Sequence, residues 1–105
     1  MMSTIKYHKL VRDRIPELIE AQGEKPNIRI LDQEEYLYHL KQKLDEEVGE
    51  YHRDKTAEEL ADILEVVYAL AEAAGCSEQE LLAAYQKKHD ARGGFGKRIF
   101  LISKD

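Results

Sequence analysis

Four acidic residues are spaced so that their carboxylates could share divalent cations. Glu47 and Glu50 are three positions apart on the first of two acidic segments. Glu59 and Asp62 have the same spacing on the second, so each pair lies on one face if both segments are helical. Only a short turn, at about residues 54–55, separates the segments, which makes the two helices antiparallel neighbours. Counted outward from that turn, the inner acid of each pair lies about one helical turn away and the outer acid about two. We therefore expect the four carboxylates to lie level across the helix pair.

Carboxylates gathered in this way repel one another and lose hydration, so the arrangement is costly without a countercharge. Ligands made of oxygen atoms alone favour Mg²⁺, with Mn²⁺ as the other candidate, over zinc. The four histidines show no ligand spacing, and the single Cys76 excludes a cysteine-rich zinc site and an internal disulfide. The alternative is a solvated helix surface, and Glu59 is also the expected capping partner of Thr56.

The segments that must position these acids have the sequence signals of helices. Three helices are expected to start at a capping residue placed three positions before a glutamate: Asp32-x-x-Glu35, Thr56-x-x-Glu59 and Ser77-x-x-Glu80. The predicted helices cover residues 16–22, 33–53, 57–74 and 78–91. Residues 24–31 and 95–103 are predicted to be extended or irregular. We expect an all-α fold with short extended segments at the termini.

The periodicity of the two central helices predicts what they bury. In the first, apolar residues follow 3-4 spacing, and either Glu47 or Val48 falls on the stripe that should face the core. The second, from Leu60 to Ala74, is apolar on nearly every side and needs cover all round. A chain of 105 residues can hardly supply that cover alone. We therefore expect one domain, residues 1–105, forming an antiparallel helical bundle completed by oligomerisation as a homodimer or homotetramer.

Composition and charge exclude several classes of protein. With 43% hydrophobic and 35% charged residues, the chain is predicted to bury a modest core. The longest apolar run, residues 66–71, is too short to span a membrane, and the first residues contain no apolar signal core. We expect a soluble, cytoplasmic protein. The net charge of −5 conceals an acidic centre between basic ends, which argues against a nucleic-acid polymer as partner and suits a small polyanion.

Two segments carry a resemblance to a known family: residues 44–50 (LDEEVGE) and residues 58–70 (EELADILEVVYAL). They resemble the MazG-like all-α nucleoside triphosphate pyrophosphohydrolases, a superfamily that includes phosphoribosyl-ATP pyrophosphohydrolase and dimeric dUTPases. Its motifs are E-E-x-x-E on one helix and E-x-x-D on the next, which together bind magnesium. Residues 9–16 (KLVRDRIP) and 92–99 (RGGFGKRI) look like the flanks of its short, phosphoribosyl-ATP-pyrophosphohydrolase-like members. The resemblance covers about residues 6–102.

The resemblance implies hydrolysis between the α- and β-phosphates of a nucleoside triphosphate, giving the monophosphate and pyrophosphate. Glu46, Glu47 and Glu50 match the first motif, and Glu59 and Asp62 match the second. The acids that we expect to ligate magnesium are the four selected by spacing: Glu47, Glu50, Glu59 and Asp62. The candidates for a catalytic general base are Glu46, Glu47 and Glu50. The candidates for holding the outer phosphates of the nucleotide are Arg12, Lys97 and Arg98.

Three functions are compatible with these residues. The first is a house-cleaning pyrophosphohydrolase that acts on standard or modified nucleoside triphosphates. The second is phosphoribosyl-ATP hydrolysis in histidine biosynthesis. The third is a non-catalytic helical oligomer that serves as an adaptor, with the acids as a solubilising surface. Inward placement of Glu47 and Asp62 would argue against the third, because an adaptor has no need to bury acids.

Overall fold

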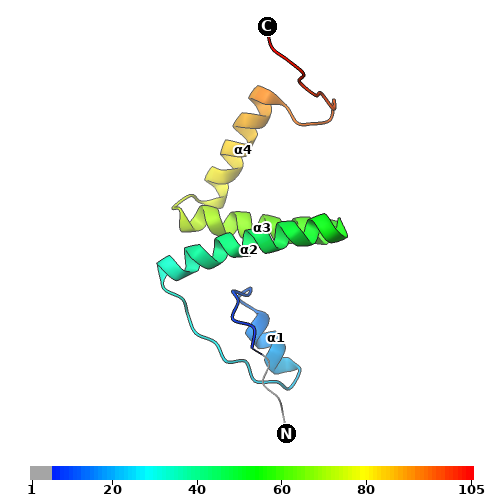
Figure 1. The fold of residues 1–105 in the computed structure, drawn as a ribbon. Helices are drawn as coiled ribbons and strands as arrows, with labels where there is room; N and C mark the ends of the chain where they lie inside the picture. The colour runs from blue at the N-terminus through cyan, green and yellow to red at the C-terminus, as the bar shows by residue number, and fades with distance from the viewer. Residues whose placement is uncertain (1–5) are drawn as a thin grey trace. The chain divides into compact units, whose positions relative to one another are not determined.

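The structure, a computed structural model, describes residues 6–105 as four helices joined by irregular segments (Figure 1). The helices are α1 (Ile15–Ala21), α2 (Gln33–Asp54), α3 (Ala57–Ala73) and α4 (Glu78–Arg92). No strand occurs in this part of the chain. The predicted all-α class is confirmed, and each predicted helix is present with its ends shifted by no more than one residue.

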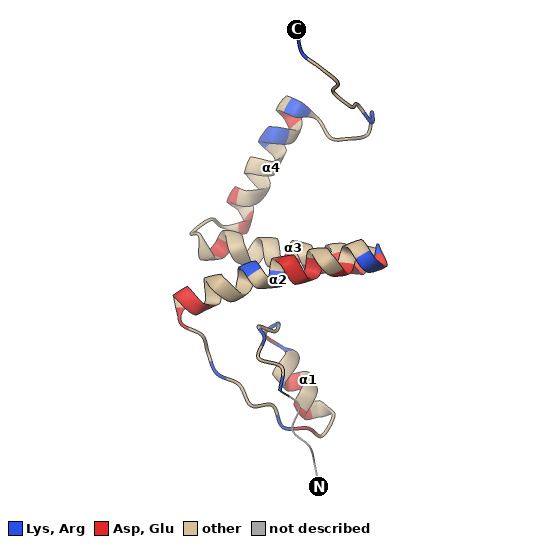
Figure 2. Ribbon diagram, viewed as in Figure 1, with Lys and Arg blue, Asp and Glu red and all other residues tan. Residues whose placement is uncertain are grey.

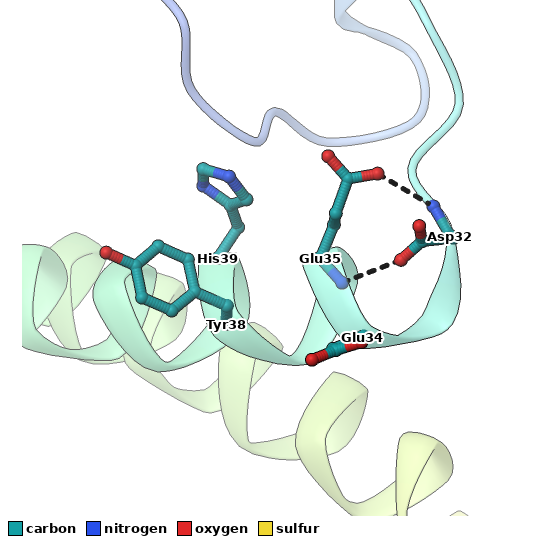
Figure 3. Close-up of a pocket in the computed structure, with 5 residues that line it drawn as sticks. All are labelled: Asp32, Glu34, Glu35, Tyr38 and His39. Carbon is teal, nitrogen blue, oxygen red and sulfur yellow. Dashed lines mark hydrogen bonds between the residues drawn. The ribbon is translucent and has the colours of Figure 1, made fainter.

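Side-chain caps explain where α2 and α4 begin. The Asp32 carboxylate accepts a hydrogen bond from the Glu35 N–H at 2.9 Å, and the Glu35 carboxylate accepts one from the Asp32 N–H at 3.4 Å (Figure 3). Ser77 and Glu80 form the same reciprocal pair at α4, with distances of 3.1 and 3.4 Å. Each box satisfies two backbone N–H groups that lack a partner within the helix. Two of the three predicted capping boxes, those at Asp32 and Ser77, are therefore confirmed in full.

The internal contacts of the chain divide it into two compact units, Met1–Leu70 and Ala71–Asp105. The first contains α1, α2 and most of α3, and the second contains the end of α3, all of α4 and the C-terminal segment. The prediction of one domain over residues 1–105 stays a prediction.

In the first unit, α2 and α3 lie side by side and antiparallel (Figure 1). They are joined through Lys55, which adopts a left-handed conformation with φ 55° and donates its N–H to the Tyr51 carbonyl at 2.8 Å. The least exposed apolar side chains are Leu40, at 3%, and Val66, at 6%. Glu47, at 6%, is as buried as they are, whereas Val48 keeps intermediate exposure. The predicted inward placement is therefore confirmed for Glu47, which lies on the core side of α2. Asp62, also predicted to face inward, keeps a side chain that is 41% exposed.

In the second unit, Gly75 ends α3 as the sequence predicts. Its φ of 81° is a conformation that glycine adopts without steric cost. The turn is closed by bonds from the Gly75 N–H to the Glu72 carbonyl and from the Cys76 N–H to the Ala71 carbonyl, at 3.0 and 2.9 Å. After α4 the chain is irregular, and its large apolar side chains from Phe95 onward are exposed. Within residues 6–105, no helix combines the length and the apolar character needed to cross a membrane.

Candidate metal centre

The four acids selected by their spacing converge in the first unit. Glu47, Glu50, Glu59 and Asp62 each offer one carboxylate oxygen, and these four oxygens all lie within 4.8 Å of one another. The spacing of three residues keeps each pair on one helix face, and the short connection sets the two faces against each other. Figure 2 shows acidic positions on both α2 and α3 toward the end where the two helices are joined. The predicted level arrangement of the four carboxylates is therefore present.

Two oxygens of this cluster lack a hydrogen-bond partner although they are buried. They are Oε2 of Glu47 and Oε2 of Glu59. A buried polar atom without a partner costs roughly 1–3 kcal/mol, and more when the group is charged. Binding to a hard cation would remove that cost at each oxygen that becomes a ligand. The residues present therefore fit a divalent cation, and the buried oxygens support this independently of the number of acids.

The pKa of Glu47 is raised above its ordinary value. Burial is the main cause, because it disfavours the charged carboxylate. The contact with Lys43 opposes this shift, and repulsion from Glu50 adds to it. The surroundings of Glu47 thus disfavour the ionised form of this one carboxyl group.

Lys43 is the basic residue closest to the buried end of the cluster. Its ammonium nitrogen lies 3.3 Å from Oε1 of Glu47 and 3.4 Å from Oε2 of Glu46. Glu46 is exposed and is not one of the four converging acids, and its other oxygen lies 4.0 Å from the Lys9 nitrogen. Lys43 was not among the site residues predicted from the sequence. A signal was available, since Lys43 precedes Glu46 by three positions and Glu47 by four, which is the spacing of ion pairs on a helix.

The side chain of Glu59 takes no part in capping α3. Its backbone N–H donates to Oγ1 of Thr56 at 3.3 Å, which is one half of the predicted capping box. Oε2 of the same residue is one of the two unpartnered oxygens. The backbone of Glu59 therefore helps to start α3, while its carboxylate belongs to the cluster.

The residues predicted to bind phosphate are divided between the two units. Arg12 belongs to the first, and its guanidinium lies 3.2 Å from Oδ1 of Asp62. Lys97 and Arg98 belong to the second, and both are exposed. Arg12 is therefore at the cluster, and the participation of Lys97 and Arg98 in the same site stays a prediction.

A hollow of about 370 Å³ lies at the N-terminus of α2 (Figure 3). The residues that line it are Asp32, Glu34, Glu35, Tyr38 and His39. Two of these form the capping box of α2, and Glu35 also accepts a hydrogen bond of 2.6 Å from Arg29. The hydrogen bond from Arg29 is the main reason that the pKa of Glu35 is lowered to about 2. Helix capping and this ion pair account for the acids of the hollow, and we assign it no ligand.

Comparison with known proteins gives a partial match. An uncharacterized protein of Mycolicibacterium smegmatis is 62% identical over 42 residues, which are 40% of this chain and 43% of that protein. The matched region thus spans less than half of either protein. No model of a protein family matches the chain. No solved structure matches it significantly.

Proposed function

We propose that this chain is a Mg²⁺-dependent nucleotide pyrophosphohydrolase of the MazG-like all-α type. It would cleave the α–β phosphoanhydride bond of a nucleoside triphosphate to give the monophosphate and pyrophosphate. The observation that carries the proposal is the convergence of four carboxylate oxygens within 4.8 Å, together with two buried oxygens that lack a partner. The resemblance of the two acidic segments to that superfamily supports the class of reaction.

The residues that would hold the cation are Glu47, Glu50, Glu59 and Asp62. All four ligands are carboxylate oxygens, which Mg²⁺ prefers and Mn²⁺ also accepts. When bound, the ion supplies positive charge that neutralises the phosphates and polarises a phosphoryl oxygen.

Proton transfer and phosphate binding would be carried out by the chain's own side chains. A carboxylate accepts the proton of the attacking water, and the candidates are Glu46, Glu47 and Glu50. Among them Glu46 lies outside the four converging acids and is not one of the proposed ligands. Arg12 would bind the outer phosphates, which a guanidinium contacts through paired N–H donors. Its contact with Asp62 joins two half-exposed side chains, a pair weak enough to exchange for a phosphate.

The burial of Glu47 also bears on the alternatives. A non-catalytic adaptor with a solubilising acidic surface would gain nothing from a carboxylate that is 6% exposed and lacks a partner at one oxygen. Phosphoribosyl-ATP is a second candidate substrate, because its hydrolysis breaks the same α–β linkage.

We also propose that the protein acts as a homodimer or homotetramer. Leu60 and Leu64 of α3 are each 49% exposed, so part of the apolar surface of this helix is uncovered within one chain. Covering such surface is favourable by about 25 cal/mol per Å². Sedimentation at micromolar concentration should show a dimer or larger species, and a monomer with a cooperative melt would contradict the proposal.

The enzymatic proposal is tested by a screen for pyrophosphate release. The protein is incubated with Mg²⁺ and standard or modified nucleoside triphosphates, or phosphoribosyl-ATP, and EDTA should abolish the release. Glu50→Gln and Asp62→Asn keep the side-chain size and remove one charged ligand each, so turnover should fall by about 100-fold or more. Asp45→Asn, an exposed acid on α2, is the matched control and should keep normal turnover. Near-normal turnover in both ligand variants would rule out the centre.

A further inference from the structure

Lys43 contacts the candidate metal centre from a largely covered position, whereas the other basic residue at the centre, Arg12, is exposed. The side chain of Lys43 is 19% exposed and lies between Glu46 and Glu47, at 3.4 and 3.3 Å. Arg12, which contacts Asp62, has a side chain that is 55% exposed. Water and salt screen exposed ion pairs far more than covered ones. Lys43 is therefore the more persistent partner of the cluster.

The contact makes the two oxygens of Glu47 unequal. Oε1 lies against the ammonium group of Lys43, whereas Oε2 is buried and has no partner. A carboxylate with two available oxygens can chelate a cation through both, but one with an oxygen already engaged offers only the other. Glu46 is restrained in a similar way, since Lys43 contacts one of its oxygens and Lys9 lies 4.0 Å from the other.

We propose that Lys43 is a positioning residue of this centre. It engages Oε1 of Glu47, so that Glu47 offers a cation one oxygen, and it keeps Glu46 beside the four converging acids rather than among them. The proposal rests on the function proposed above. Because its own positive charge repels a cation, Lys43 weakens cation binding while preserving the carboxylate arrangement that turnover requires.

The test separates cation affinity from turnover. Mn²⁺ is titrated calorimetrically into the nucleotide-free wild type, Lys43→Met and Lys43→Arg, and kcat and KM are then measured with saturating Mg²⁺. Lys43→Met should bind Mn²⁺ about three- to tenfold more tightly, because a repelling charge is lost and both oxygens of Glu47 become available. Its kcat should fall by about tenfold or more with little change in KM. The reason is that Lys43 no longer keeps the Glu46 carboxylate away from the four converging acids.

Two further variants complete the design. Lys43→Arg restores a cation with several donors and should return both quantities toward the wild-type values. Lys41→Met removes an exposed lysine of the same helix and should leave Mn²⁺ affinity unchanged. If Lys43→Met does not fold, Lys43→Gln, which keeps a polar side chain, replaces it in the same titration.

The outcomes distinguish this inference from the proposed function. Unchanged or weaker Mn²⁺ binding in the uncharged variant overturns the positioning role, since a merely structural lysine would lower affinity, turnover and melting temperature together. If the wild type binds no Mn²⁺, both the proposed metal centre and the proposed role of Lys43 are wrong. A wild type that binds Mn²⁺ but releases no pyrophosphate from any nucleotide overturns only the reaction, and the Mn²⁺ affinities still decide the role of Lys43.

Discussion

The substitution Glu47→Gln separates the effect of the acidic cluster on metal-free stability from its role in binding a cation. Glutamine keeps the size of this buried side chain and removes its charge. Glu47 is 6% exposed, and burial raises its pKa, so the folded protein disfavours the charged form. We expect the metal-free variant to be more stable than the wild type at neutral pH, as at other functional sites that are maintained at a cost in stability.

Coulomb's law gives the size of this effect. At 4.8 Å, the largest separation among the four oxygens, two like charges repel by about 0.9 kcal/mol even at the dielectric constant of water. Three such repulsions act on Glu47, and the attraction to Lys43 at 3.3 Å offsets about 1.3 kcal/mol of them. Neutralising Glu47 should therefore stabilise the metal-free protein by about 1 kcal/mol, which for a chain of this size raises Tm by about 5 °C.

The stability gain should depend on pH in a defined direction. The pKa of Glu47 is higher in the folded protein than in the unfolded chain, so the folded state binds the proton more tightly. Wild-type stability is therefore lost as pH rises from the unfolded value, about 4.3, through the raised folded value. The advantage of Glu47→Gln should be present at neutral pH and disappear below the unfolded pKa.

Thermal melts with EDTA and with excess Mg²⁺ would measure both effects. Mg²⁺ should raise the Tm of the wild type by mass action and raise that of Glu47→Gln less. Asp45→Asn changes an exposed acid of the same helix and should reproduce the wild-type melts. Repulsion within the cluster is refuted if Glu47→Gln melts at or below the wild-type temperature in EDTA. The cation site is refuted if Mg²⁺ raises the Tm of both proteins equally or of neither.

Three other substitutions, one of them with a matched control, test the fold. Leu40→Ala removes the least exposed apolar side chain and should lower the free energy of unfolding by about 2–4 kcal/mol in a urea titration, whereas Leu82→Ala, at a side chain 46% exposed, should lower it far less. Ser77→Ala removes the cap of α4 and should cost about 1 kcal/mol, seen as faster amide hydrogen exchange in the first turn of that helix. Arg29 lowers the pKa of Glu35 to about 2. The wild type should therefore lose stability relative to Glu35→Gln as pH falls from about 4.5 toward 2. Parallel profiles of unfolding free energy against pH would contradict this.

The sequence by itself determined the helices and the set of acids. The signals at Asp32 and Ser77 predicted where two helices begin, and both capping boxes are present. The spacing within each acidic pair predicted that its members share a helix face, and the short connection predicted that the two faces meet. These features could be predicted because capping and helical spacing depend on residues within about one turn of each other. Lys43 followed the same local rule and could have been selected in the same way.

Tertiary structure alone decided which side chains are buried and which charges meet across the chain. Periodicity allowed either Glu47 or Val48 to face the core, and in the folded chain it is the acid that is buried. Arg12 was predicted only as a phosphate-binding residue, but its guanidinium lies 3.2 Å from Asp62, fifty positions along the chain. Burial and long-range ion pairs depend on how distant segments approach in space, and local sequence signals act too short a distance along the chain to specify that approach.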